Sequence, residues 1–359
     1  MEFDKIQENN NIKSFILNNT PIDNVLHVIA VVSNPCNYKI RYKLMDEFID
    51  RMLKEPHVIL YVVELVYGDQ PFEITSTDNK YHLQLRGEIP LWHKENMINL
   101  GIKKLLPSDW KAVAWIDSDV DFDNPYWVLN TLQILNGGKD IVQLFVNVFD
   151  MNFNEETLNI YTGFGYQYCK GLIKGMGINY WHPGYAWACN RAAYDQMGLL
   201  YQSGILGAGD NILSHGFVEH ATNSLKPGMT QMYLDDVKRF QDKMEGLKLG
   251  YVPGTIRHFF HGKKENRNYW GREDILIKYN FDPTTFIEYN SDGLIIPSKI
   301  VPKEFIIDIF DYFKNRDEDE VFLESLEKNK TSIHVLKYKL KFILREFEKM
   351  KQKDKDKLA

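Results

Sequence analysis

Four aspartates follow a short apolar run and alternate with other residues. The run covers residues 112–116, and the acids are Asp117, Asp119, Asp121 and Asp123. Such a run is typical of a buried strand, and in open α/β sheets ligands bind at the carboxyl ends of the strands. Carboxylate oxygens at that place can hold Mg²⁺ or Mn²⁺, which in turn binds a diphosphate. Asp117 and Asp119 are therefore candidate metal ligands.

Three other interpretations of this acidic motif remain. The acids could form a solvated turn after the strand. The spacing also resembles the start of an EF-hand loop, which needs glycine at its sixth position and glutamate at its twelfth. Counted from Asp117, these positions hold Phe122 and Val128. The end of the motif is typical of a helix start, with Asp123 or Asn124 as N-cap before a proline. We favour this last interpretation, which leaves the first two acids free for a metal.

Two histidines, His258 and His261, follow a later apolar segment and could complete the metal site. A single histidine there would more often be structural, but a pair together with distant aspartates favours a shared ion. A mixed oxygen and imidazole site favours Mn²⁺ over Mg²⁺. Four basic residues come directly afterwards, Lys263, Lys264, Arg267 and Arg272. They could bind phosphate oxygens, or they could belong to a solvated loop.

A carboxylate and three aromatic residues could serve a second substrate. Asp210 lies in the glycine-rich segment 207–211, at the expected start of a helix. It could accept a proton as a general base, or it could simply cap the helix. Trp181, Tyr185 and Trp187 lie on a short segment bounded by glycine and proline. Exposed aromatic rings stack on sugars, whereas buried rings belong to the core, and we expect at least one of the three to be core.

Alternating strands and helices in the first half predict an α/β fold with a mostly parallel sheet flanked by helices. The expected strands cover residues 25–32, 58–66, 81–86, 112–116 and 140–148, and the expected helices 39–54, 90–106 and 125–135. In the second half the expected strands are short, and one at 249–262 leads into the histidines. The chain is predicted to be helical again from about residue 301.

The length of 359 residues allows one large or two small domains. We expect a polar N-terminal segment at 1–24, a catalytic domain at 25–300 and a helical, charged extension at 301–359. Within the domain, residues 25–150 would bind a nucleotide and 151–300 an acceptor. The extension carries an apolar stripe at helical spacing, formed by Ile333, Leu336, Leu340, Ile343, Leu344 and Phe347. This stripe could pack on its own domain, form a homodimer through C-terminal helices, or lie on a membrane surface.

Composition argues against some partners and locations. The net charge is −6, and no basic stretch is interleaved with aromatic residues, so nucleic acid is not an expected partner. The three cysteines, Cys36, Cys169 and Cys189, have no zinc-type spacing and are expected to be reduced. No signal-peptide core and no run of eighteen apolar residues is seen, which predicts a cytoplasmic protein without a transmembrane segment.

In order and spacing, four of these motifs resemble the metal-dependent GT-A glycosyltransferases, of the β-1,4-galactosyltransferase and polypeptide N-acetylgalactosaminyltransferase type. Residues 92–102 resemble Phe-Asn-Arg-Ala-Lys-Leu-Leu-Asn-Val-Gly-Phe, and Lys94 takes the place of the nucleotide-binding basic residue. Asp117-Ser-Asp119 takes the place of the Asp-x-Asp metal motif. Leu-Gly-Ala-Gly-Asp-Asn at 206–211 resembles Trp-Gly-Gly-Glu-Asp-Asp and puts Asp210 where the family has its base. The histidine pair and its basic loop resemble a ligand-x-x-His segment followed by a Lys-Lys-rich loop.

The resemblance covers residues 25–280 and implies a role for each matching position. The implied metal ligands are Asp117, Asp119, His258 and His261. The implied nucleotide-binding residues are Arg41, Glu64, Lys94, Asn99, Asp117, Lys263 and Arg267. The donor would be a nucleotide sugar such as a UDP-sugar, used with Mn²⁺ or Mg²⁺, and the acceptor a glycan or glycoprotein. Departures from the family pattern at Leu206 and Gly209 put the acceptor site and the donor sugar in doubt.

The predicted function is therefore transfer of a sugar from a nucleotide diphosphate to an acceptor hydroxyl. One alternative is a nucleotidyltransferase, which would need a phosphate-binding glycine loop after the first strand, whereas residues 33–37 read Ser-Asn-Pro-Cys-Asn. Another is a non-catalytic glycan- or nucleotide-sugar-binding protein with the same fold, because fold alone does not establish function.

Overall fold

The computed structural model describes residues 12–171, 181–218, 220–269 and 271–321, together with Lys341, Leu344, Arg345 and Glu348. Apart from Leu344, the apolar stripe of the C-terminal extension lies outside these residues. The proposed homodimer contact through the C-terminal helices therefore also lies outside the described part of the chain.

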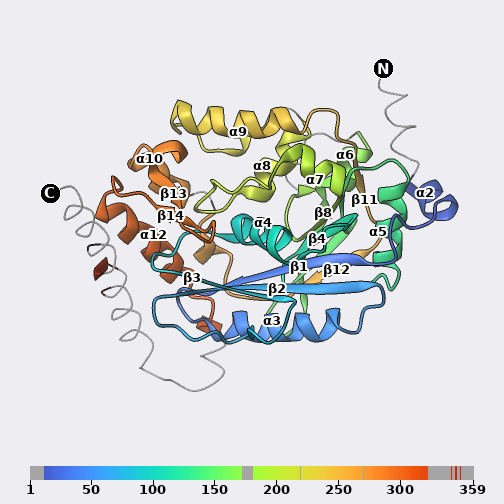
Figure 1. The fold of residues 1–359 in the computed structure, drawn as a ribbon, viewed down its shortest axis with the longest axis horizontal. Coiled ribbons are helices and arrows are strands. Elements are labelled where there is room, and N and C mark those ends of the chain that lie inside the picture. The colour runs from blue at the N-terminus through green and yellow to red at the C-terminus, as the bar shows by residue number, and fades with distance from the viewer. Residues whose placement is uncertain are drawn as a thin grey trace.

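A seven-stranded sheet forms the centre of the molecule (Figure 1). Its order is β11-β6-β10-β4-β1-β2-β3, and every adjacent pair is parallel except the two that involve β10. The strands are β1 Leu26–Ser33, β2 Val58–Tyr67, β3 His82–Gly87, β4 Ala112–Ile116, β6 Ile141–Gln143, β10 Ala186–Asn190 and β11 Leu249–Tyr251. The mostly parallel α/β sheet predicted from the sequence is confirmed.

Helices cover both faces of this sheet because successive side chains of β1 point to opposite sides. Val28 packs in a core with Phe48 of α3, Lys39–Met52, and with Leu132 of α5, Trp127–Asn136. Ile29 packs in the core on the other face, with Met97 of α4, Lys94–Leu105. In Figure 1, α3 accordingly lies below the sheet and α4 above it. The short helix α2, Ile12–Asn18, contacts α5.

A second sheet contains five short strands in the order β5-β12-β7-β8-β9. They are β5 Val120–Phe122, β12 Thr255–His258, β7 Asn147–Met151, β8 Thr157–Gly163 and β9 Trp181–His182. The predictions of one continuous strand at 140–148 and another at 249–262 are wrong. The first segment is divided into β6 and β7 and the second into β11 and β12, and the two members of each pair belong to different sheets. Pro253-Gly254, with a Gly254 φ of 148°, breaks the second pair. The first break was hidden because Leu144 and Phe145 stay buried as the chain crosses between sheets.

The other helices follow in the second half of the chain. They are α6 Phe164–Cys169, α7 Arg191–Met197, α8 Gly209–Gly216, α9 Gln231–Lys243, α10 Glu273–Lys278, α11 Pro283–Phe286 and α12 Lys303–Asn315, with 3-10 turns at Ala221–Ser224 and Glu265–Arg267. A hairpin of β13 Ile287–Tyr289 and β14 Ile295–Pro297 precedes α12. The helix predicted from residue 301 is confirmed as far as α12. The helix predicted at 125 begins two residues later, with Tyr126 as its N-cap and Asn124 accepting from the Tyr126 N–H.

Two sequence-based expectations can be compared with the described residues. Cys36, Cys169 and Cys189 are all buried, and none of them forms a disulfide. In the part of the chain that the structure describes, no helix combines the length and the apolar character needed to cross a bilayer.

Candidate active site

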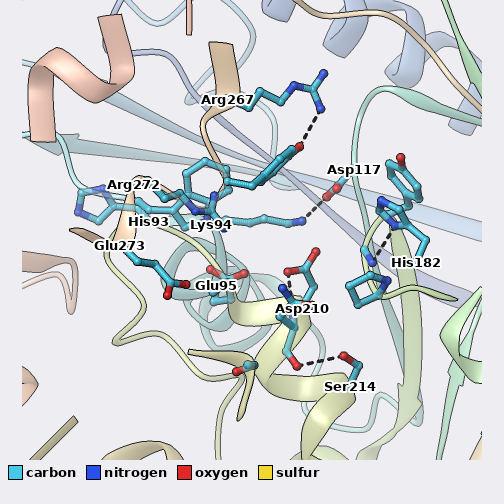
Figure 2. Close-up of a pocket in the computed structure, with 18 of the residues that line it drawn as sticks. His93, Lys94, Glu95, Asp117, His182, Asp210, Ser214, Arg267, Arg272 and Glu273 are labelled. Carbon is cyan, nitrogen blue, oxygen red and sulfur yellow. Dashed lines mark hydrogen bonds and ion pairs between the residues drawn. The ribbon is translucent and has the colours of Figure 1, made fainter. Parts of the chain in front are cut away.

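A cavity of about 1330 Å³ opens where β1 and β4 end, between the two sheets and helices α4 and α8. Its lining comes from many separate parts of the chain, among them the end of β1, the start of α4, the turn after β4, the loop before α8 and the segment after β12. Figure 2 shows charged side chains from several of these segments pointing into the same space. Its volume exceeds the range of about 300–1,000 Å³ that is typical of a pocket for one small ligand.

Asp119, His258 and His261 converge at one end of this cavity. The Asp119 Oδ2 atom lies 2.8 Å from His261 Nε2 and 3.6 Å from His258 Nε2. The pairing of β5 with β12 explains the convergence, because it places Val120 opposite His258, and the Phe259 N–H donates to the Asp119 carbonyl. One ligand atom from each of the three residues lies within 4.8 Å of the others.

A second carboxylate orients the more buried of the two histidines. His258 Nδ1 lies 2.7 Å from Asp150 Oδ1, and Asp150 Oδ2 lies 2.6 Å from Lys264 Nζ. Burial lowers the pKa of His258, but the carboxylates of Asp119 and Asp150 raise it by more. Burial likewise raises the pKa of Asp119, yet the two imidazoles hold it well below its ordinary value. We call Asp119, Asp150, His258 and His261 the metal corner.

The metal corner fits a divalent transition metal. Its donor set is one carboxylate and two imidazoles, which suits Mn²⁺ better than Mg²⁺. Asp119 Oδ1 is buried and has no hydrogen-bond partner within the described structure, and a metal would use that oxygen. Metal-ligating histidines usually bond a carboxylate through their other ring nitrogen, as His258 does with Asp150. Three of the four metal ligands expected from the sequence therefore lie together.

Asp117, the fourth, is paired with a lysine instead. Its Oδ1 lies 2.5 Å from Nζ of Lys94, the first residue of α4, and Figure 2 shows the lysine extending across the cavity to reach it. Burial lowers the pKa of Lys94, but Asp117 and then Asp210 raise it by more, so the ammonium group stays charged. The pair joins the turn after β4 to the start of α4 and provides a cation beside the metal corner.

Asp210 lies on the cavity wall, but it does not cap its helix. The N-cap of α8 is Ala208, with φ 78°, and it makes no side-chain cap bond. Gly207 also has a positive φ, of 99°, so two successive left-handed residues turn the chain into α8. Asp210 Oδ1 accepts from the Asn211 N–H, and a Cβ on Gly184 would lie 2.7 Å from Asp210 Oδ2. Gly184 thus leaves room for the carboxylate, and the strained loop fixes its position.

Glu95 is a second carboxylate on this wall and was not recognised from the sequence. A Cβ on Gly209 would lie 2.3 Å from its Oε1 atom, so the side chain packs against the loop that carries Asp210. Burial raises its pKa to about 7; Lys94 lowers that value and Asp210 raises it. The only signal in the sequence was its position next to Lys94.

Two of the three candidate acceptor aromatics line the cavity. Trp181 packs with its ring centroid 4.2 Å from that of Phe164, and Tyr185 stacks on His182 with centroids 4.1 Å apart. Trp187 is 1% exposed in β10, and its Nε1 donates to the Pro183 carbonyl. Trp187 is therefore the core residue that the sequence led us to expect among the three.

Arg41 lies at the cavity edge but is bound by the C-terminal acidic run. Its Nε and Nη2 atoms lie 2.5 and 2.7 Å from the two carboxylate oxygens of Glu318, and its Nη1 donates to the Ser33 carbonyl. Glu318 also pairs with Arg316 at 2.7 Å. The next residue, Asp319, accepts from the N–H groups at the start of α3. A run expected only to be highly charged thus supports one wall of the site.

Three residues that the resemblance placed at the nucleotide lie outside the cavity lining. Glu64 is 1% exposed and accepts from the backbone of residues 73–75. The Asn99 side chain donates to the Leu200 carbonyl and accepts from the Leu200 N–H, and so holds α4 to the segment around Leu200. Lys263 pairs with Glu320 at 2.5 Å. The hydrogen-bonding groups of all three are used by the protein. Arg267, by contrast, lines the cavity.

Comparison with known proteins gives distant structural similarity only. No protein-family model and no curated protein sequence matches this chain. Among similar solved structures is Drosophila β-1,4-galactosyltransferase 7 with manganese, UDP-Gal and xylobiose, at 9% identity over 79% of this chain and 98% of its own, with a TM-score of 0.38. Another is a mannosyltransferase from Pyrobaculum calidifontis with GDP-Man and Mn²⁺, at 9% identity over 97% and 90%, with a TM-score of 0.41.

A third is a putative nucleotide-diphospho-sugar transferase from Desulfovibrio desulfuricans, at 12% identity over 71% of this chain and 97% of its own, with a TM-score of 0.29. These neighbours are nucleotide-sugar transferases, the class that the sequence motifs resemble. The three TM-scores lie below 0.5, so this likeness is a distant one.

Proposed function

We propose that the protein is a metal-dependent glycosyltransferase that moves a hexose from a nucleotide diphosphate, such as a UDP-sugar, to a hydroxyl of a glycan or glycoprotein. The observation that carries the proposal is the metal corner beside the Lys94–Asp117 pair, in one cavity with the carboxylates of Asp210 and Glu95. A departing diphosphate needs a metal and cations, and an acceptor hydroxyl needs a base. The cavity contains groups for each of these needs.

Each group has a separate task in this proposal. Asp119, His258 and His261 would hold Mn²⁺, which when bound neutralises charge on a departing diphosphate. Lys94 stays protonated and stabilises the same charge from the α4 side. Asp210, fixed by the turn at Gly207 and Ala208, accepts the proton of the acceptor hydroxyl if the reaction inverts configuration.

The aromatic residues and α4 would position the substrates. Trp181 offers a partly exposed ring on the cavity wall, on which a sugar can stack. Asp117 holds Lys94 toward the metal corner, and this fixed position reduces the entropy cost of binding the donor diphosphate.

Turnover of nucleotide sugars, with and without Mn²⁺, tests this function. The wild-type protein is expected to hydrolyse or transfer at least one UDP-sugar in a Mn²⁺-dependent manner, and Asp119→Ala is expected to lose that activity. Asp121→Ala is the matched control, because Asp121 belongs to the same acidic run but pairs with Arg51 at 3.7 Å.

The outcomes separate the candidate functions. Binding of a nucleotide sugar by the wild type with no turnover toward any acceptor would favour the non-catalytic alternative. Equal loss of activity in Asp121→Ala and Asp119→Ala would contradict the assignment of the metal corner.

A further inference from the structure

Two arginines on the cavity wall carry buried charges without a carboxylate partner. Arg267 and Arg272 are 6% and 7% exposed, and both line the cavity. Neither forms an ion pair within the described residues, and the Nε atom of each is buried with no hydrogen-bond partner there. Burying a charge is costly unless it is paired and hydrogen-bonded. Two buried guanidinium groups without a carboxylate partner favour the binding of an anion.

A tight turn brings the two arginines to the same wall. The 3-10 turn Glu265–Arg267 ends at Asn268, which adopts a left-handed conformation with φ 41°. The Asn268 carbonyl then accepts from the Arg272 N–H, just before α10 begins. Tyr269 lies between the guanidinium groups: its hydroxyl accepts from Arg267 Nη1 at 3.1 Å, and its ring centroid lies 5.3 Å from the Arg272 Cζ atom.

The nearest acids are already used. Glu273, the neighbour of Arg272, accepts from the Lys226 N–H at 2.6 Å. Glu318 is bound by Arg41 and Arg316. Neither carboxylate forms an ion pair with Arg267 or Arg272, and each acts on these arginines only from a longer distance.

The positive charge of Arg272 and Arg316 shifts the pKa of a nearby tyrosine hydroxyl. Tyr312 Oη lies 3.5 Å from Arg272 Nη1 and 3.3 Å from Arg316 Nη1. Burial raises the pKa of Tyr312, but the two arginines lower it by more, so the net shift is downward. The downward shift shows that positive charge from these arginines reaches this part of the cavity wall.

We propose that Arg267 and Arg272, on either side of Tyr269, bind a carboxylate or phosphate group of the acceptor, which would make the protein a transferase for acidic glycans. The place of Arg272 in the cavity favours the acceptor over the donor diphosphate. A Cβ on Gly207 would lie 2.8 Å from Arg272 Nη1, so this arginine packs against the loop that carries Asp210. The inference rests on the proposed function, in which Asp210 faces the acceptor.

Sulfate binding to the protein, with the diphosphate site already filled, tests the proposal, and the melting temperature is the readout. Saturating UDP and Mn²⁺ are added first, and sulfate is then titrated into wild type, Arg272→Met, Arg272→Lys and Lys278→Met. Charge-assisted hydrogen bonds contribute enough that losing them should weaken sulfate binding by about tenfold or more in Arg272→Met. Arg272→Lys should recover part of the binding. Lys278→Met should behave as wild type, because Lys278 of α10 pairs with Asp308 outside the cavity lining.

The melting temperature of the ligand-free protein distinguishes this proposal from a purely structural role for Arg272. Removing an unpaired buried charge should leave the melting temperature of the ligand-free protein unchanged or higher in Arg272→Met. A large drop in that temperature, with sulfate binding retained, would overturn the proposal. General stabilisation by sulfate, which acts through exclusion from the surface, is common to all four proteins and cancels in the comparison.

Competition experiments distinguish the donor from the acceptor. If sulfate and UDP exclude each other on the wild-type protein, the arginine pair serves the donor diphosphate and the acceptor assignment is wrong. Simultaneous binding of both supports it. Failure of UDP with Mn²⁺ to bind the wild-type protein would contradict the proposed function instead, and sulfate binding without UDP would still report on the arginine pair.

Discussion

Two groups of charged side chains in the cavity differ in how their charges are paired. In the metal corner, Asp119 contacts two imidazoles, and His258 is held by Asp150, which in turn pairs with Lys264. Glu95, Asp210, Arg267 and Arg272, which we call the unpaired corner, form no ion pair within the described residues. The metal corner is therefore organised before a ligand arrives, whereas charges in the unpaired corner are left for substrates to complete.

This difference has an energetic reason. A metal site gains affinity from ligands that are already oriented, because little entropy is then lost on binding. Unpaired buried charges, in contrast, cost stability in the empty protein and recover that cost only when a complementary group binds. Variants in the two corners should consequently have different effects on binding, rate and stability.

The largest effect is expected for Asp210→Asn, in the unpaired corner. Asparagine has nearly the same shape but cannot accept the proton, so transfer should fall about 10²–10⁴-fold. The melting temperature and the affinity for UDP with Mn²⁺ should stay close to wild type, since Asp210 does not cap α8. Steady-state transfer assays and calorimetry measure the two quantities.

Asp242→Asn, on the polar end of α9, serves as the control for the general effect of this substitution. Survival of transfer in Asp210→Asn would remove the base from the proposed mechanism. A product that retains the anomeric configuration, seen by NMR, would do the same.

An intermediate effect is expected for Asp150→Asn in the metal corner. Asparagine can still accept from His258 but loses the charge that pairs with Lys264. Loss of such an outer partner typically costs about 10–100-fold in metal affinity. Calorimetric titration with Mn²⁺ checks this. Asp123→Asn is the matched control, because Asp123 follows β5 and pairs with Arg257, the neighbour of His258 on β12, at 2.9 Å. Equal affinities in both variants would mean that the metal corner is not organised as described.

The smallest effect is a pH-dependent change in stability for Glu95→Gln. Burial raises the pKa of Glu95 in the folded protein to about 7, above its ordinary value of 4.5. Its contribution to stability is therefore fully present below about pH 4.5 and is lost as the pH rises through about 7. Glutamine stays neutral, so the melting temperature of Glu95→Gln should rise relative to wild type between pH 5 and pH 8.

Melting curves across this pH range, with Glu288→Gln on the exposed edge of β13 as control, measure the difference. A constant offset between Glu95→Gln and wild type at every pH would show that Glu95 does not titrate there.

The sequence by itself determined the α/β class, most elements of the first half and several motifs around the cavity. Strand β4 has the bounds that were predicted, because its apolar run ends abruptly at Asp117. The prediction of a metal site at Asp119 required only local features, namely a strand end, the residue types and their spacing. Such features are readable because side-chain periodicity and strand ends are properties of neighbouring residues.

Only the tertiary structure decided which of these groups meet. Sequence spacing does not reveal that Asp117 pairs with Lys94, that Asp150 orients His258, or that Glu318 reaches Arg41 across 277 residues. The division of β6 from β7 was likewise invisible, since residues that cross between two sheets stay buried. Local sequence fixes the direction in which a side chain leaves its own strand or helix, whereas its partner depends on how distant elements pack, and that packing is set by the whole core.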